Sequence, residues 1–334
     1  MTSPAALIPP KGVWVPSPTF FTPASASSDS DSLQPAVDVS AQIQHSIFLA
    51  QSGITGIVLG GSTGEAVHLS RAERSTLISS VRKGLDEAGF PGYPLMAGVL
   101  TNGLEETLEW LNDYAQAGAQ WGLVLTPGYF GGAVTQEGIV DWYRVVADKS
   151  PIPVLVYNYP GVTNGVHVLP ETYRELARHG KIVGCKMSHG NVSHHVQVSL
   201  DPAINHDEFR VFSGFGAQLG PIVQFGAAGV IDGMAAFFPK TVVRLMKLVE
   251  QHLAGDATPE TRAEIHRLQY VVSLGEEFVM RYGIVGIKEA TCRVVNFGKL
   301  GVGRQPIGLS MPEGTWRKAQ SQFLADIAKT EASL

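Results

Sequence analysis

Lys186 ends an apolar run, Ile182 to Lys186, that has the composition of a buried β-strand. A lysine amine that is removed from water becomes less basic, because burial penalises its charged form. Such an amine can attack a carbonyl carbon near neutral pH and form an imine. A lysine at a strand end can also extend to solvent, and from the residue alone this alternative is the more common one.

Two further segments carry polar groups that could work beside such an amine. Tyr157 ends the apolar run Ile152 to Tyr157, and Asn158, Tyr159 and Pro160 follow it. The other segment is Gly60-Gly61-Ser62-Thr63-Gly64-Glu65, in which three glycines allow a tight turn and two hydroxyls stand beside backbone N–H groups. A loop of this kind can hold a carboxylate. The alternatives are a buried aromatic with one satisfied hydroxyl, and a plain turn before a helix capped by Ser70.

Eight apolar runs with many β-branched residues are spaced along the first 231 residues, and segments with helical spacing of apolar residues lie between them. Continuous apolar strands alternating with amphipathic helices are typical of a parallel sheet covered by helices. We therefore predict an α/β fold, a (β/α)8 TIM barrel with a C-terminal helical extension. An open doubly wound sheet is the second choice, but no GxGxxG motif follows the first run. The predicted strands are Val13–Phe20, Ile54–Leu59, Leu95–Val99, Trp121–Leu125, Ile152–Tyr157, Ile182–Lys186, Phe209–Phe212 and Ala227–Ile231.

The predicted domains are a barrel over residues 1–234, which carries the active site, and C-terminal helices over 235–334 packed on it. Residues 24–34, rich in Ser, Asp and Ala, are predicted to form a polar surface loop. Thr258 is expected to cap a helix that starts at Pro259. The expected C-terminal helices are Val242–Leu253, Pro259–Met280, a short one over Ile284–Arg293, and Glu313–Ile327.

Composition excludes several classes of protein. The 334 residues include 25 Lys and Arg against 30 Asp and Glu, a net charge of -5, so no basic field is available for nucleic acid. Apolar runs such as Phe225 to Ile231 are too short to cross a membrane. Two cysteines, neither in a zinc-binding pattern, and no targeting signal lead us to expect a cytoplasmic protein without a bound metal or other cofactor.

Three motifs together resemble one family. Gly61-Ser62-Thr63-Gly64-Glu65 with the following Leu69-Ser70 and Glu73-Arg74, then Tyr157-Asn158-Tyr159-Pro160, then Gly184-Cys185-Lys186, are similar to signatures of the dihydrodipicolinate synthase / N-acetylneuraminate lyase superfamily of class I aldolases. The resemblance runs from about Gly12 to the C-terminus, and Lys186 follows Tyr157 by 29 residues, close to the family spacing. Within this superfamily the chain looks most like the fungal 2-keto-3-deoxy-L-galactonate aldolases.

The resemblance implies roles for the catalytic residues. Lys186 would form an imine with the C2 carbonyl of a 2-oxo acid, and the imine nitrogen would accept electrons while the C3–C4 bond breaks. Tyr157 would carry protons to and from the reacting groups, and the Thr63 hydroxyl would polarise it. Ser62 and the N–H groups of Ser62 and Thr63 would hold the carboxylate of the pyruvate part.

Other implied roles concern the walls of the pocket and the assembly. Gly214 and Ile231 match positions whose backbone lines the pyruvate pocket. Tyr129 resembles a tyrosine that many members insert into a neighbouring subunit, so a homotetramer built as a dimer of dimers is expected. Lys288, in Ile287-Lys288-Glu289-Ala290, looks even more like the family's lysine segment than Lys186 does, but it follows the eighth run, so we predict Lys186 as the nucleophile.

The substrate prediction rests on departures from the family pattern. Dihydrodipicolinate synthases have an arginine shortly after Tyr-Asn-x-Pro that binds a second carboxylate, whereas this chain has Gly161 to Gly165 without one. Neutral donors and acceptors suit a polyhydroxyl aldehyde better. We therefore predict cleavage of a 2-keto-3-deoxy sugar acid, 2-keto-3-deoxy-L-galactonate above others, to pyruvate and L-glyceraldehyde. The neutral residues expected near the aldehyde part are His68, Thr163, Asn164, Ser188 and His189.

Three alternatives stay open at this point. The first is a 4-hydroxy-2-oxoglutarate aldolase, which yields pyruvate and glyoxylate, because those enzymes share the Gly-Ser-x-Gly-Glu variant. A cationic side chain in the distal pocket would favour it. The second, of another class, is a barrel that binds 2-oxo acids without catalysis. A metal-dependent aldolase is the third, although no set of His and carboxylate ligands stands out at the strand ends.

Overall fold

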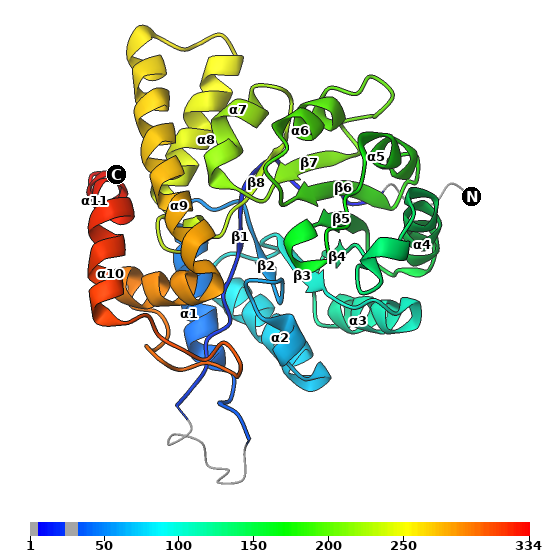
Figure 1. The fold of residues 1–334 in the computed structure, drawn as a ribbon, viewed down its shortest axis with the longest axis horizontal. Coiled ribbons are helices and arrows are strands. Elements are labelled where there is room, and N and C mark those ends of the chain that lie inside the picture. The colour runs from blue at the N-terminus through cyan, green and yellow to red at the C-terminus, as the bar shows by residue number, and fades with distance from the viewer. Residues whose placement is uncertain (1–5, 24–32) are drawn as a thin grey trace.

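The computed structural model describes residues 6–23 and 33–334, and it forms a closed barrel of eight parallel strands (Figure 1). The strands follow one another in chain order around the barrel, and β1 pairs with both β2 and β8, which closes it. The predicted TIM barrel is therefore confirmed. The strands are β1 (Gly12–Pro16), β2 (Gly56–Leu59), β3 (Leu95–Val99), β4 (Trp121–Leu125), β5 (Val154–Asn158), β6 (Ile182–Met187), β7 (Arg210–Ser213) and β8 (Gly229–Ile231).

Within the described residues, eight α-helices cover the outside of the barrel, one after each strand (Figure 1). Side-chain hydrogen bonds cap the first turn of several of these helices. The Asp38 carboxylate accepts from the N–H of Ala41 at the start of α1, and Ser70 forms a capping box with Glu73 at the start of α2. The helices are α1 (Val39–Gln51), α2 (Arg71–Glu87), α3 (Leu104–Gln116), α4 (Gln136–Lys149), α5 (Pro170–Leu176), α6 (Val192–Ser199), α7 (Leu219–Val223) and α8 (Pro239–Leu253).

Both faces of the strands are buried, which explains why apolar and polar residues do not alternate along them. One face packs under the helices, and the other fills the barrel interior. In the interior, Trp14 makes edge contacts with Trp121 and Phe212, with ring centroids 5.7 and 6.3 Å apart. The barrel is thus filled by side chains in its middle, and only its ends can form a binding site.

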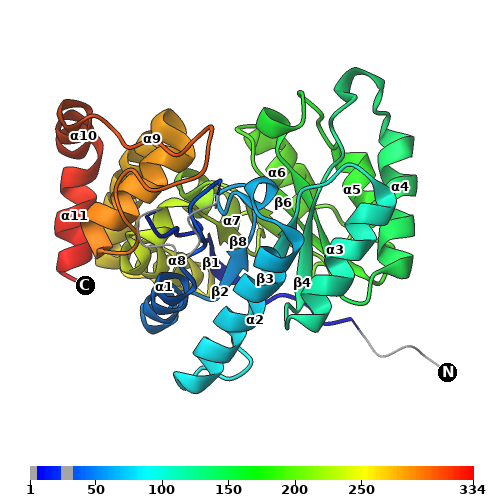
Figure 2. The same ribbon diagram turned by 90° about the horizontal axis from the view of Figure 1, so that it is seen from below.

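The C-terminal helices pack against α8 and the end of the barrel (Figure 2). They are α9 (Pro259–Val295), α10 (Glu313–Ala319) and α11 (Ala325–Ala332), the last two joined by a π-helical turn over Gln320–Leu324. Thr258 caps α9 as predicted, and the two predicted helices of this stretch meet at Gly283, whose φ of 55° and ψ of -143° interrupt α9. The boundary predicted after residue 234 precedes α8. Because α8 follows β8 and completes the covering layer, we propose that the barrel includes α8 and ends after Leu253.

Strand register brings together residues that are far apart in the sequence. Tyr157 of β5 lies opposite Lys186 of β6, and Lys186 lies opposite Phe212 of β7. All three stand near the carboxyl ends of their strands, where the loops that follow strands build the working face of a TIM barrel. The predicted loop 24–34 lies, except for its last two residues, outside the described part of the chain.

Candidate active site

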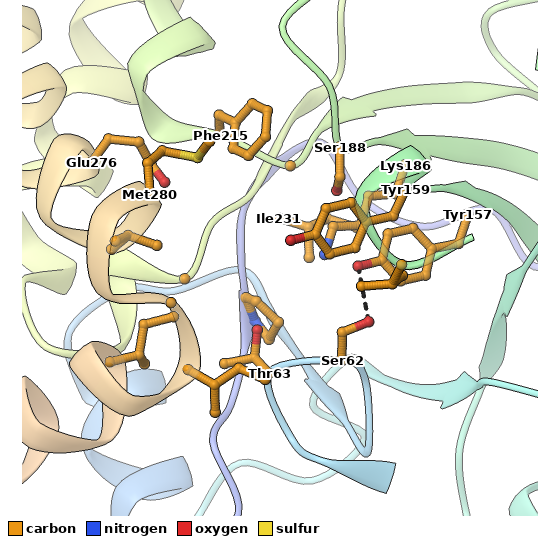
Figure 3. Close-up of a pocket in the computed structure, with 18 residues that line it drawn as sticks. Ser62, Thr63, Tyr157, Tyr159, Lys186, Ser188, Phe215, Ile231, Glu276 and Met280 are labelled. Atoms are coloured by element: carbon orange, nitrogen blue, oxygen red, sulfur yellow. Dashed lines mark hydrogen bonds between the residues drawn. The ribbon is translucent and has the colours of Figure 1, made fainter. Parts of the chain in front are cut away.

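A cavity of about 180 Å³ lies at the carboxyl ends of the strands, between the barrel and α9 (Figure 3). It brings together most of the residues predicted from the sequence to act in catalysis. From α9 come side chains around its interruption at Gly283, so the C-terminal helices close one side of the cavity. The predicted residues that line it are Ser62, Thr63, Tyr157, Lys186, Ser188, Gly214 and Ile231.

Lys186 is buried and lines this cavity, with its Nζ 4.6 Å from the centre of the Tyr157 ring. Burial lowers the pKa of the amine from 10.5 to about 7, and the nearby charges of Asp232 and Glu276 oppose this effect. At neutral pH a large share of the amine is therefore unprotonated. This is the state in which it can attack a carbonyl carbon.

The Tyr157 hydroxyl lies 3.3 Å from the Ser62 Oγ, and either atom can donate in this hydrogen bond (Figure 3). Burial raises the pKa of Tyr157 to about 12, while Ser62 and Ser188 oppose the shift. The phenol therefore stays protonated at neutral pH. Thr63 lines the cavity too, but Ser62 is the residue that contacts Tyr157, because successive residues of the turn direct their side chains differently.

A buried ion pair between Glu65 and Lys288 fixes the loop after β2. Glu65 adopts a left-handed conformation with φ of 52°, and its carboxylate accepts from Lys288 Nζ at 2.8 Å and faces His68 Nδ1 at 3.2 Å. The Glu65 side chain has no solvent exposure and that of Lys288 has 16%. Lys288 therefore anchors the loop and does not line the cavity, whereas Lys186 does.

The backbone of the same loop offers free donors. In the part of the chain that the structure describes, the N–H groups of Ser62 and Thr63 donate to no other protein group. Both residues line the cavity, so these N–H groups can bind a carboxylate.

The residues predicted to bind the aldehyde part are distributed over three places. Ser188 lies in the cavity of Lys186. Thr163, Asn164 and Tyr129 line a second cavity of about 390 Å³, which shares Ser62, Val162 and Ile284 with the first. His189 lines a third cavity, of about 410 Å³, which shares Tyr159, Ser188, Phe215, Glu276 and Met280 with the first. His68 lines none of these three cavities and instead contacts Glu65.

Sequence reasoning missed several residues in and beside the site, among them two aromatic and two acidic side chains. Tyr159 and Phe215 line the cavity, and the Tyr159 ring stacks on Tyr157 with centroids 6.1 Å apart. Asp232 directly follows β8 and could have been found by its place at a strand end. Glu276, on α9, gives no signal in the sequence, because only tertiary packing brings that helix to the barrel.

Neither a metal site nor a membrane span is found in the described residues. No group of three or more His, Cys, Asp or Glu within residues 6–23 and 33–334 is placed to hold a metal ion. Over the same residues, each helix is too short or too polar to cross a bilayer.

Comparison with known proteins decides the family. Residues 28–310 match the Dihydrodipicolinate synthetase family. The chain belongs to this family. The predicted resemblance is thereby confirmed, together with the expectation that the chain is an enzyme of this family, whose curated relatives include several aldolases.

Two kinds of fungal relative match this family member over most of its length. It is 33% identical to the L-threo-3-deoxy-hexylosonate aldolase of Hypocrea jecorina, over 89% of this chain and 90% of the relative. It is also 33% identical to a protein of Emericella nidulans that carries the name of mitochondrial 4-hydroxy-2-oxoglutarate aldolase, over 86% of both chains. Among solved structures, a dihydrodipicolinate synthase family protein from Coccidioides immitis is 30% identical, with a TM-score of 0.80 and 98% of each chain covered.

Proposed function

We propose that this enzyme cleaves 2-keto-3-deoxy sugar acids, 2-keto-3-deoxy-L-galactonate above others, to pyruvate and L-glyceraldehyde through an imine on Lys186. The observation that carries the proposal is the buried Lys186 amine, beside the Tyr157 ring, in a cavity with no second cationic side chain among the described residues that line it. The aldolase names of the fungal relatives support a carbon–carbon lyase.

The reaction begins at Lys186. Its unprotonated amine attacks the C2 carbonyl carbon of the substrate, and loss of water with uptake of one proton gives a cationic imine. That proton is released again when water later cleaves the imine. The substrate carboxylate lies against the free N–H groups of Ser62 and Thr63. This arrangement holds C2 within reach of Nζ.

The C3–C4 bond then breaks, and its electron pair moves to the imine nitrogen to give an enamine. As the bond breaks, the 4-hydroxyl passes its proton to the Tyr157 oxygen, while Tyr157 passes its own proton along the hydrogen bond to Ser62, which hands one on to water. The aldehyde leaves, the enamine is protonated at C3, and water releases pyruvate and regenerates the amine. Protons and electrons balance without an external oxidant or reductant.

The charge of the surrounding cavities favours a neutral aldehyde part. Besides Lys186, no Lys or Arg is found among the described residues that line the three connected cavities. His189 is neutral at physiological pH, because burial first, and neighbouring histidines second, lower its pKa to about 4. A second carboxylate would therefore lack a charged partner, at a cost of about 2 kcal/mol or roughly 30-fold in affinity.

A second candidate is 4-hydroxy-2-oxoglutarate aldolase, because two of the fungal relatives carry that name. The two activities are distinguished by the ratio of kcat/KM for 2-keto-3-deoxy-L-galactonate to kcat/KM for 4-hydroxy-2-oxoglutarate. We expect the ratio to exceed about 10. A ratio below 1 would reject the sugar acid in favour of the second candidate.

A designed variant tests the reasoning on charge. Val162 is half exposed, lines both the first and the second cavity, and stands in the segment where dihydrodipicolinate synthases have their arginine. Val162→Arg should raise kcat/KM for 4-hydroxy-2-oxoglutarate by about 10-fold or more relative to the sugar acid. Val162→Met, of similar bulk but neutral, serves as the control and should leave the ratio unchanged.

We also propose the homotetramer and the cytoplasmic compartment that the sequence predicts. Tyr129 is 73% exposed, and the Asn102 side chain holds its loop by accepting from the N–H groups of Gly128 and Tyr129. An exposed ring on a fixed loop is suited to contact a second subunit. Sedimentation would test the assembly, and imaging of a C-terminally tagged chain would separate cytoplasm from mitochondria.

A further inference from the structure

Asp232 and Glu276 form a buried pair of carboxyl groups beside the cavity of Lys186. Asp232 follows β8 and is fully buried, while Glu276 lies on α9 and is 3% exposed. Glu276 lines the cavity from the α9 side, opposite the strands that carry Lys186 and Tyr157 (Figure 3). The reaction described above uses neither carboxyl group.

No cation pairs with either carboxyl group in the described part of the chain, in contrast to Glu65, which has Lys288. Two adjacent buried carboxylates without a cationic partner cannot both stay ionised, because repulsion adds to the cost of burial. Burial raises the pKa of both groups, and for Glu276 the nearby Asp232 raises the pKa further. One of the two therefore keeps a proton at neutral pH.

Backbone donors show which group keeps the negative charge. Asp232 Oδ1 accepts from the N–H of Met234 and Oδ2 from the N–H of Ala235, each at 3.1 Å. Glu276 Oε2 accepts from the N–H of Gly216 at 2.9 Å. The backbone N–H groups that lower the pKa are those of Gly216 and Ala217 for Glu276, and those of Met234, Ala235 and Gly216 for Asp232, so Asp232 has the larger set. Because hydrogen bonds to a carboxylate favour its ionised form, the charge resides on Asp232 and the proton on Glu276.

Gly216 is required for this arrangement. A Cβ atom at this position would lie 2.9 Å from Asp232 Oδ2, closer than carbon and oxygen atoms normally approach. The glycine thus lets the loop after β7 approach Asp232 while its N–H binds Glu276. The pair is enclosed by the loop after β7, the turn after β8 and α9, and it forms a defined site.

The charge of this pair acts on the Lys186 nitrogen. Asp232 and Glu276 are the two groups that oppose the effect of burial on the pKa of that amine, and of the two it is Asp232 that carries the negative charge. The same nitrogen carries the positive charge of the imine during the reaction. Because Asp232 and Lys186 are both buried, a single fixed negative charge stabilises such a cation more than it would in water.

We propose that Asp232 and Glu276 share one proton and act as a single buried negative charge, held on Asp232, that stabilises the cationic imine on Lys186. Both are positioning residues, since they act through Lys186. The inference rests on the proposed function, because it requires the imine. It assigns to the end of β8 a role that none of the predicted site residues fills.

Other ionisable groups near the pair do not supply this charge. Tyr157 and Tyr159 line the same cavity and are neutral, because burial raises the pKa of both. His189 and Glu277 line the third cavity with Glu276; His189 is neutral, and Glu277 is exposed to solvent. Glu277→Gln is therefore the matched control for Glu276→Gln, with the same chemical change one residue away.

The test compares Asp232→Asn, Glu276→Gln and Glu277→Gln with the wild type, after thermal melting has shown that each variant folds. Trapping yield with borohydride, measured by mass spectrometry against pyruvate concentration, gives the dissociation constant of the pyruvate imine. We expect Asp232→Asn to weaken the imine about tenfold or more, the equivalent of one pKa unit. Glu276→Gln should weaken it less than about threefold, and Glu277→Gln not at all.

The outcomes separate the alternatives. Equal or greater weakening in Glu276→Gln than in Asp232→Asn would overturn the assignment of the charge, and an unchanged imine in Asp232→Asn would overturn its role. The infrared band of a protonated carboxyl group, recorded without pyruvate, should be present in the wild type at pH 7 and absent in Glu276→Gln. If Asp232→Asn does not fold, the presence or absence of that band decides whether the pair shares a proton. Failure of the wild type to form any adduct would instead refute the proposed function itself.

Discussion

The Lys288–Glu65 ion pair leads to a prediction about stability. The same prediction tests whether Lys288 has a structural role, in contrast to the catalytic role proposed for Lys186. Lys288→Met removes the cation and leaves the Glu65 carboxylate with no exposure and without its partner at 2.8 Å. Breaking a buried pair from one side typically costs 3–5 kcal/mol. His68, 3.2 Å from the other carboxylate oxygen, can offset part of this loss. We therefore expect a loss of about 3 kcal/mol in the free energy of unfolding, or roughly 4 °C in melting temperature for a chain of this size.

Urea unfolding of four proteins measures the effect: wild type, Lys288→Met, Glu65→Gln and the double variant. The double variant should be more stable than Lys288→Met alone, because the neutral amide no longer requires a cation. Lys247→Met, an exposed lysine on α8, is the control and should change stability by less than about 0.5 kcal/mol. A Lys288→Met protein as stable as the wild type would refute the anchoring role.

The remaining predictions concern catalysis and assembly. Tyr157→Phe should lower kcat by roughly 100-fold or more while the pyruvate imine still forms, whereas Tyr159→Phe should change kcat by less than tenfold; equal losses would argue against proton transfer by Tyr157. Because the Lys186 pKa is lowered to about 7 and only the unprotonated amine reacts, kcat/KM should rise about tenfold per pH unit below pH 7 and level off above it. A flat profile between about pH 5 and 7 would contradict that assignment. Tyr129→Ala should lower kcat and weaken the proposed tetramer in sedimentation. A Tyr129→Ala protein that is monomeric and yet fully active would show that Tyr129 is not part of the site.

Much of the barrel could be predicted because parallel strands in a TIM barrel are buried on both faces. The predicted bounds of β3 and β4 agree with the structure residue for residue. β3 begins directly after Pro94, and β4 is an apolar run between Gln120 and Thr126. The first strand is shorter than predicted and ends at Pro16. Pro16 and Pro18 lack an N–H, so strand pairing does not continue to Phe20.

Those residues of the candidate site that lie at the ends of strands could be predicted from the sequence. Those that reach the site through the packing of distant elements could not. Lys186 and Tyr157 lie next to each other because strand order fixes which strands are neighbours. Glu276 stands beside Glu277 on a helix, a pattern that in the sequence indicates a solvent-facing surface. Only the packing of α9 on the barrel mouth buries the first and leaves the second exposed. The distribution of the predicted aldehyde-side residues over three cavities also depends on loop geometry, which sequence spacing does not fix.

The most direct test of the central claim is borohydride trapping with pyruvate followed by peptide mass mapping, on the wild type and on Lys186→Met and Lys288→Met. We expect a pyruvate-derived mass on the peptide that contains Lys186, in the wild type and in Lys288→Met, and none in Lys186→Met. An adduct on Lys288, or no adduct on any peptide of the wild type, would contradict the account. The second outcome would favour a barrel that binds 2-oxo acids without cleaving them.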